Sequence, residues 1–288
     1  MFGPYTKVAR RFIFFFLFPL ALQASDRPNF ILILIDDMGW KDVGFAGSNL
    51  APTPNIDALA KKGLIFKQAY ASAPNCAPTR ACLMTGQYTP RHGIYTVIDD
   101  RHTPGSPQQK IMAAESKSEL PSNTLTLADI LKSNGYSTGM VGMWNLGRGK
   151  TGPASPLGRG FQYFTEPKAL GFEKDAYLRN DGSELTDVMT DAVIKWMTEH
   201  KDGPFFLYFA PHAVHAPFEP KPEIRRQEGS DGGRVRRHDR RFGSEYRETL
   251  CRTGKTRTNE KHPYLFHLGQ RRDPSVQRPS SGRKGISL

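Results

Sequence analysis

The chain has 288 residues, of which 38% are apolar and 24% charged, so it can form one large domain or two small ones around a sizeable core. Its three cysteines exclude a disulfide-dense scaffold, and no group of Cys and His has the spacing of a zinc site. The net charge of +12 is unevenly spread: residues 1–220 hold 22 Lys and Arg against 20 Asp and Glu, whereas residues 221–288 hold 18 against 8. The basicity therefore belongs to the end of the chain and says little about the partners of the rest.

The N-terminus has the order of segments found in secretory signal peptides. Three basic residues precede an apolar run from Phe12 to Leu22, and Ala24 then precedes Ser25. We expect residues 1–24 to be removed and the protein to be exported to a periplasmic, secreted or lysosome-like compartment. The run is shorter than the roughly 20 apolar residues of a spanning helix, so we expect no stable membrane span. An uncleaved anchor is the alternative.

The chain up to about residue 220 alternates predicted strands and helices. The apolar runs at 29–35 and 204–210 are typical of strands buried on both faces of a parallel sheet. Between them, apolar residues at helical spacing predict helices, two of which end at Gly or Asn-Gly. This alternation predicts an α/β fold built in layers. The predicted order is strand 29–35, helix 54–63, helix 125–135, strand 137–141, helix 186–200 and strand 204–210.

Polar side chains follow two of these strands. Asp36 and Asp37 come directly after the first strand, and His212 and His215 come after the last. Ligand sites in open α/β sheets gather at the carboxyl ends of the strands, so we expect these side chains to lie near one another. Two adjacent carboxylates suit Ca²⁺ or Mg²⁺, although such a pair more commonly forms a turn or caps a helix. A pair of histidines is likewise more commonly structural.

The segment Cys76 to Gly86 combines a cysteine with proline, arginine and a terminal Thr-Gly at fixed spacing. The charge of Arg80 could lower the pKa of a nearby thiol or hold an anion. A single cysteine in apolar surroundings is more commonly a buried core residue. The composite motif favours a functional site over that ordinary role.

Together these motifs resemble the type I sulfatase family, whose members depend on formylglycine. The matching segments follow one another in the family's order over about residues 27–220. The resemblance implies an alkaline-phosphatase-like α/β sheet flanked by helices, incomplete at its C-terminal end, and arylsulfatase-like hydrolysis of sulfate esters. The segments that carry it are Asn29–Gly39, Thr53–Asp57, Cys76–Gly86, Arg91–Gly93, Gly135–Thr138, Gly160–Phe164 and Pro204–Pro217.

The resemblance also implies a role for each matched side chain. Cys76 would be converted by a maturation enzyme to formylglycine, whose hydrate attacks the sulfur of the ester. Asp36 and Asp37 would hold a divalent cation, Ca²⁺ rather than Mg²⁺, beside the modified Cys76. Arg80 would stabilise the developing charge, and His215 would contact the diol or the sulfate, with the other histidine in support. The implied substrate is a sulfated small molecule or a sulfated glycan.

Two positions depart from the family pattern. Where the family usually has Lys-Trp-His-Leu-Gly, this chain has Met143 in place of the lysine and Asn145 in place of the histidine. Loss of one ionic contact made in the transition state costs roughly 3–4 kcal/mol, or two to three decades of rate. We therefore expect impaired activity. The alternatives are a paralogue or decayed fragment that binds sulfate esters without turnover, and a phosphoester hydrolase of the same superfold.

The basic tail, residues 226–288, lacks apolar periodicity and lacks the family's second metal-binding motif, Asp-Asn-Gly. An arm that binds nucleic acid is one interpretation, but export argues against a nucleic-acid partner. We favour a frameshift, because residues 267–272 can be read one base later as Thr-Ser-Asp-Asn-Gly. We therefore divide the chain into a signal peptide at 1–24, a partial catalytic domain at 25–225 and an out-of-frame, disordered tail at 226–288.

Overall fold

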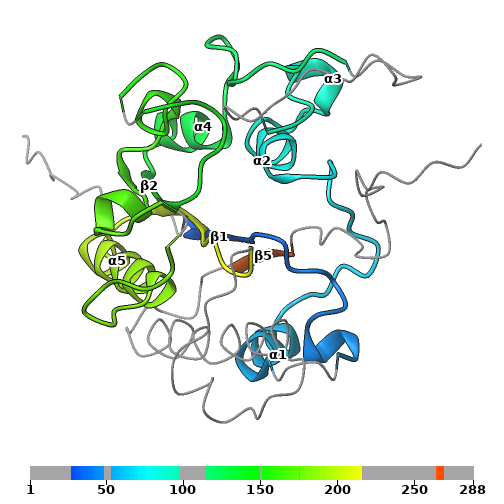
Figure 1. The fold of residues 1–288 in the computed structure, drawn as a ribbon, viewed down its shortest axis with the longest axis vertical. Helices are drawn as coiled ribbons and strands as arrows, with labels where there is room; N and C mark the ends of the chain where they lie inside the picture. The colour runs from blue at the N-terminus through cyan, green and yellow to red at the C-terminus, as the bar shows by residue number, and fades with distance from the viewer. Residues whose placement is uncertain are drawn as a thin grey trace, which may run out of the picture.

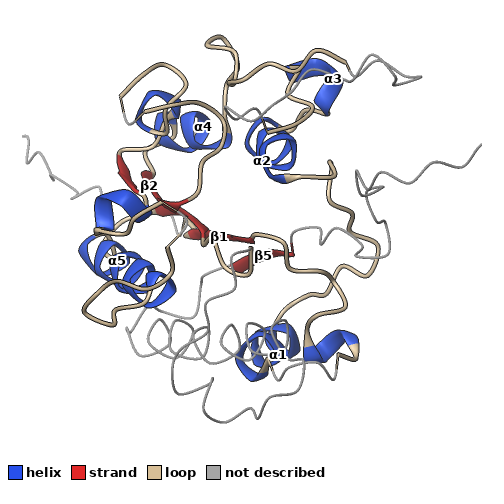
Figure 2. Cartoon of the chain, in the orientation of Figure 1, coloured by secondary structure: helices blue, strands red, loops and turns tan. Residues whose placement is uncertain are grey.

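The strands, drawn red in Figure 2, lie between the helices. They form a five-stranded parallel sheet with the order β3-β2-β4-β1-β5. The strands are β1 (Phe30–Ile35), β2 (Ser137–Gly142), β3 (Tyr163–Thr165), β4 (Phe205–Ala210) and β5 (Tyr264–Leu268). Three of them are the expected strands, within one residue of their predicted bounds. The computed structural model describes residues 27–48, 53–97, 114–149, 151–174 and 176–215, together with the backbone of 264–268.

Helices cover both faces of this sheet (Figure 1). All three predicted helices form, within two residues of their expected ends, and the α/β fold is confirmed. The α-helices are α1 (Pro54–Lys62), α2 (Cys76–Thr85), α3 (Thr89–His92), α4 (Leu127–Ser133) and α5 (Leu185–Glu199). Three short 3-10 helices are η1 (Gly44–Ala46), η2 (Leu157–Arg159) and η3 (Pro167–Leu170).

Two hydrophobic cores, one on each face, explain the continuous apolar run of β1. Ile31, Ile33 and Ile35 point into the core that α1 and α5 share. Leu32 and Leu34 point into the opposite core, with α2 and α4. Successive side chains of a strand point to opposite faces, so a strand covered on both sides needs apolar residues at every position.

Helix α5 packs on the sheet through one stripe of side chains. Its buried residues include Met189, Val193 and Trp196, spaced at three and four positions as expected for one helix face. Trp196 lies against the backbone of β2 at Gly139, where an added Cβ atom would come within 2.6 Å of the indole Cε2. A glycine at this position therefore lets the helix and the sheet approach closely.

Strand β5 differs from the expectation that residues 226–288 are disordered. Residues 264–268 pair in parallel with β1, with Leu268 level with Ile35. The segment Tyr-Leu-Phe-His-Leu is rich in aromatic and apolar residues, which favour strands, and it covers the edge of β1 that β4 leaves open. The prediction of disorder missed this short segment because strongly basic flanks surround it.

The proposed signal peptide lies outside the described residues, so its removal stays a prediction. Within the described ranges, no helix is both long and apolar enough to cross a bilayer.

We predict that Gly139→Ala destabilises the protein by about 1–3 kcal/mol, because the new methyl group overpacks against Trp196. Urea unfolding followed by tryptophan fluorescence measures the effect. Gly203→Ala is the matched control, since among the described residues, apart from its chain neighbours, no atom lies within 4 Å of the added Cβ there. Equal unfolding midpoints for the two variants would show that Trp196 does not press on β2.

Candidate active site

The site lies at the carboxyl ends of neighbouring parallel strands, as the sequence predicts. Asp36 and Asp37 follow β1, Met143 follows β2, and the segment that carries His215 follows β4. The loops are tied together there: the Val214 N–H donates to the Asp36 carbonyl at 3.0 Å. Asp37 has a left-handed backbone with φ of 59°, a conformation that Asp tolerates better than most residues and that is common at functional sites.

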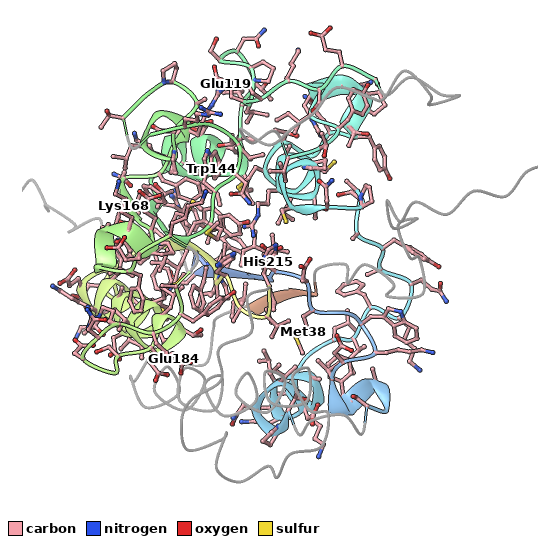
Figure 3. The ribbon with its side chains drawn as sticks, viewed as in Figure 1. Met38, Glu119, Trp144, Lys168, Glu184 and His215 are labelled. Carbon is pink, nitrogen blue, oxygen red and sulfur yellow. The ribbon has the colours of Figure 1, made fainter. Side chains whose placement is uncertain are left out.

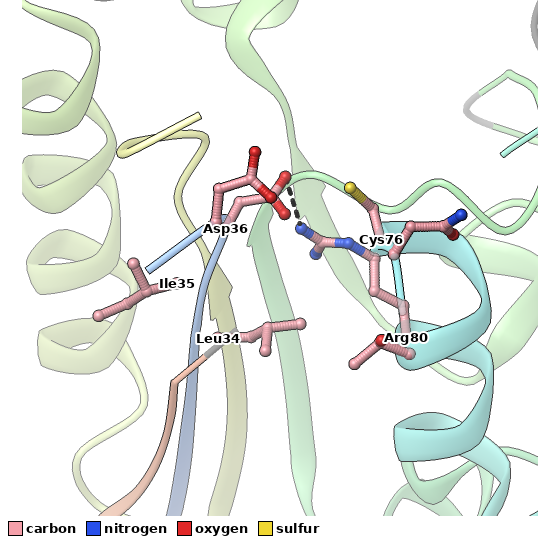
Figure 4. Close-up of a pocket in the computed structure, with 8 residues that line it drawn as sticks. Leu34, Ile35, Asp36, Cys76 and Arg80 are labelled. Carbon is pink, nitrogen blue, oxygen red and sulfur yellow. Dashed lines mark ion pairs between the residues drawn. The ribbon is translucent and has the colours of Figure 1, made fainter. Parts of the chain in front are cut away.

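Helix α2 brings the cysteine and the arginine to the same place. Cys76 is the first residue of α2 and Arg80 lies one turn further on, so both side chains lie on one face of the helix. Figure 4 shows Asp36, Cys76 and Arg80 around one pocket, with the ion pair drawn as a dashed line. Two segments that are 40 residues apart in sequence therefore contribute to one site.

Arg80 is completely buried and links four elements of the fold. Its Nη2 pairs with Asp36 Oδ2 at 3.4 Å, and its Nη1 donates to the Met143 carbonyl at 2.6 Å and to Tyr208 Oη at 3.0 Å. Burial alone would lower the pKa of Arg80, but the neighbouring Tyr208 oxygen and Asp36 carboxylate raise this pKa, so the guanidinium stays charged. The site thus contains a fixed positive charge out of contact with water.

Tyr208 is a contributor that the sequence analysis missed. It is one of a run of aromatic residues on β4, and nothing in that run distinguishes it from a core residue. Burial raises the pKa of its phenol, so it stays neutral and its oxygen accepts the hydrogen bond from Arg80. Only the alternation of the strand, which turns Tyr208 toward α2, could have singled it out.

The pKa of the Cys76 thiol is raised in the folded protein. Arg80 does lower its pKa, but burial and the carboxylate of Asp36 outweigh that effect and raise the pKa to about 12. The expected effect of Arg80 is therefore present, but it does not activate the unmodified thiol. A neutral thiol is a weak nucleophile and a weak metal ligand.

The pocket at this position has room for about one water-sized particle, roughly 20 Å³. Asp36, Asp37 and Cys76 line it together with Asn75, whose Oδ1 is buried without a hydrogen-bond partner among the described residues. Oxygen donors of this kind fit Ca²⁺ in chemistry, although Ca²⁺ takes six to eight oxygens. Within the described residues, no three His, Cys, Asp or Glu side chains group closely enough to hold a metal. The predicted metal ligands Asp36, Asp37 and Cys76 thus line one pocket, and their binding of a cation stays a prediction.

The two histidines lie beside this pocket. His215 Nε2 is 3.8 Å from Asp37 Oδ2, so the structure brings the predicted catalytic histidine to the predicted metal ligand. His212 is buried and stacks on His215, with ring centroids 4.9 Å apart. The contact with Asp37 places His215 beside a residue that lines the pocket.

The two unusual positions also lie at this edge of the sheet. Met143 follows β2 directly, and its backbone carbonyl is the acceptor for Arg80. Asn145 has a left-handed backbone with φ of 59°, which asparagine and histidine both adopt more readily than most residues. The backbone at Asn145 is therefore one that a histidine can also adopt.

The chain is similar to known sulfatases. The Sulfatase family model matches residues 28–254, about 30 residues beyond the expected end of the resemblance. N-acetylgalactosamine-6-sulfatase of Mus musculus is 33% identical over 225 residues, covering 69% of this chain and 42% of that protein. Arylsulfatase A of Bos taurus is 32% identical over 236 residues, covering 68% and 43%. This chain therefore spans less than half the length of these relatives.

A solved structure supports the same fold. The crystal structure of Ps i-CgsB in complex with k-i-k-neocarrahexaose superposes with a TM-score of 0.66 and 27% sequence identity. The match covers 84% of this chain and 58% of the other.

We predict that iodoacetamide alkylates unconverted Cys76 at neutral pH roughly a hundredfold more slowly than an unperturbed cysteine, because few molecules carry the thiolate. The rate should rise with pH toward about 12, where the thiol ionises. Peptide mass spectrometry of time points measures it, and the urea-unfolded protein is the reference. Asp36→Asn should speed the reaction, since the charge of Arg80 then acts on Cys76 without the opposing carboxylate. Equal rates in folded and unfolded protein would contradict the raised pKa.

Proposed function

Because the chain belongs to the sulfatase family, we propose that it hydrolyses sulfate esters at the pocket between β1 and α2. One observation carries this proposal: Asp36, Asp37, Cys76 and Arg80, which the sequence singled out separately, line a single pocket. In that pocket Arg80 would bind the anionic substrate, Asp36 and Asp37 would bind a cation, and Cys76 is the position of the modified residue.

Cys76 is the catalytic position in its converted form. With a pKa of about 12, the unmodified thiol is protonated near neutral pH and cannot serve as an effective nucleophile. Formylglycine, which a maturation enzyme would make from Cys76, would supply an oxygen nucleophile at this position when hydrated. The first turn of α2 orients this residue toward Asp36 and Arg80.

Arg80 binds the sulfate group in this proposal. Its Nε and Nη2 are buried and make no hydrogen bond within the described part of the chain, although Nη2 pairs with Asp36. A planar guanidinium with free N–H groups can donate to two oxygens of one sulfate. Met143 adds no second cation beside it, which supports weak binding of the transition state and impaired turnover.

Asp36 and Asp37 hold the cation, Ca²⁺ in preference to Mg²⁺, in line with the carboxylate oxygens that they present. When bound, such a cation polarises the sulfate oxygens.

The position of β5 supports the frameshift hypothesis. This strand pairs with β1 and ends at Leu268, level with Ile35. In the shifted reading frame, Asp and Asn occupy the two positions that follow Leu268. Asp36 and Asp37 follow β1 in the same way.

His215 completes the proposed site, where its imidazole can move a proton to or from the ester beside Asp37. The substrate class is a sulfated glycan or a sulfated small molecule. In support, Ps i-CgsB was solved with a carrageenan-type hexaose, and the mouse relative is named for a sulfated amino sugar. Export through the N-terminal signal would bring the enzyme to such substrates outside the cytoplasm.

The test uses the full chain produced together with a formylglycine-generating enzyme. We expect the wild-type protein to hydrolyse 4-methylumbelliferyl sulfate slowly. Chelation of Ca²⁺ should abolish this activity, and the Cys76→Ala variant should have none. Met143→Lys combined with Asn145→His should raise the rate at least roughly tenfold, because each restores a group for the transition-state charge.

The matched control is Met143→Leu combined with Asn145→Ala, which changes the same positions without adding a cation or an imidazole. It should not raise the rate. Binding of a sulfated oligosaccharide with no turnover in any variant would favour the non-catalytic paralogue that Met143 and Asn145 suggest. Turnover that persists in Cys76→Ala would contradict the proposed site.

A further inference from the structure

A stack of three rings leads from the core to the pocket. Tyr177 is completely buried, and its ring lies 5.4 Å from that of His212 with only 6° between their planes. His212 stacks in turn on His215, at 4.9 Å and 21°. His215, labelled in Figure 3, comes from the segment after β4. Its Nε2 lies 3.8 Å from Asp37 Oδ2.

The hydroxyl of Tyr177 also holds the backbone of that segment. It donates to the carbonyl of His212 at 3.2 Å and to the carbonyl of His215 at 2.5 Å. A phenol has one proton to donate, so the two carbonyls share it. These are the two ends of the turn closed by the bond from the His215 N–H to the His212 carbonyl, at 3.0 Å. The hydroxyl therefore fixes the turn, while the ring supports the imidazoles.

Tyr177 is itself held firmly at the entry to α5. Its carbonyl accepts from the Leu185 N–H at 2.8 Å, and an antiparallel bridge joins Leu178 to Glu184. Its side chain packs in the core beneath the sheet with Leu185 and Met189. The hydroxyl of this buried core residue thus contacts the turn that carries His215, the predicted catalytic histidine.

We propose that Tyr177 and His212 are positioning residues that hold the imidazole of His215 against Asp37. The proposal rests on the proposed function in so far as His215 serves the hydrolysis of sulfate esters. Tyr177 acts through its hydroxyl and its ring, and His212 acts as a flat spacer between two other rings. Neither residue needs to touch the substrate.

Labelling with diethyl pyrocarbonate tests the position of His215 without any need for activity. Tyr177→Phe keeps the ring and removes the hydroxyl, so the turn loses the hydrogen bond that holds it. His215 should then become carbethoxylated about fivefold faster, the factor that corresponds to the loss of one typical hydrogen bond. Peptide mass spectrometry reads each histidine separately. His200, which stacks on Trp196 elsewhere in the fold, should react at an unchanged rate and serves as the internal control.

The matched variant is Tyr136→Phe, which removes the hydroxyl of another buried tyrosine, one that stacks on Phe30. It should leave the reactivity of His215 unchanged. An unchanged rate at His215 in Tyr177→Phe, in a protein that unfolds at the wild-type urea concentration, would overturn the proposal. A fall in stability with faster labelling at His200 as well would show a general structural role and overturn it too.

Two substitutions at His212 test the stack separately from the hydroxyl. His212→Phe keeps a flat ring and should label at His215 as the wild type does, whereas His212→Ala should label faster. Equal labelling in both variants would show that the ring of His212 does not position its neighbour.

Steady-state kinetics add a second readout. A misplaced His215 should lower kcat roughly tenfold in Tyr177→Phe, with KM changed less than about twofold, because substrate contacts are retained. If the wild-type chain turns over no sulfate ester, the proposed function fails, and the labelling still decides whether Tyr177 positions His215. If the wild type is active and kcat and labelling are both unchanged in Tyr177→Phe, the positioning role alone is wrong.

Discussion

A buried guanidinium holds the parts of this site together. Arg80 has no exposed surface, and placing a charge there costs several kcal/mol unless a partner and hydrogen bonds compensate for the lost water. Its three partners come from three other parts of the fold: Asp36 follows β1, the Met143 carbonyl follows β2, and Tyr208 lies on β4. Each partner is required to offset the same buried charge, so the geometry of the pocket depends on this one side chain.

The same charge arrangement decides what the pocket can do. The first 220 residues carry almost equal numbers of positive and negative side chains, so the charges in the pocket are set by Arg80, Asp36 and Asp37 rather than by the domain as a whole. Burial and Asp36 keep the thiol of Cys76 neutral. An unmodified cysteine is therefore a weak nucleophile in this environment.

Sequence patterns were sufficient for the layers of the fold and for four residues that line the pocket, Asp36, Asp37, Cys76 and Arg80. Continuous apolar runs predicted β1 and β4 because both faces of the sheet are covered, and Asp36 and Asp37 were placed by the rule that sites gather at carboxyl ends of strands. Contacts that form only in three dimensions could not be predicted. Tyr177 lies in a polar segment without periodicity, and the raised pKa of Cys76 depends on burial that no local pattern shows.

The central claim is that Arg80, Asp36 and Asp37 form one binding site for a sulfate ester and a cation. A crystal structure of the Cys76→Ala variant with Ca²⁺ and a sulfated oligosaccharide tests it most directly. The account predicts the sulfate group within hydrogen-bond distance of the Arg80 guanidinium and Ca²⁺ bound by both carboxylates. A sulfate group bound elsewhere, with the Arg80 donors still unused, would contradict it.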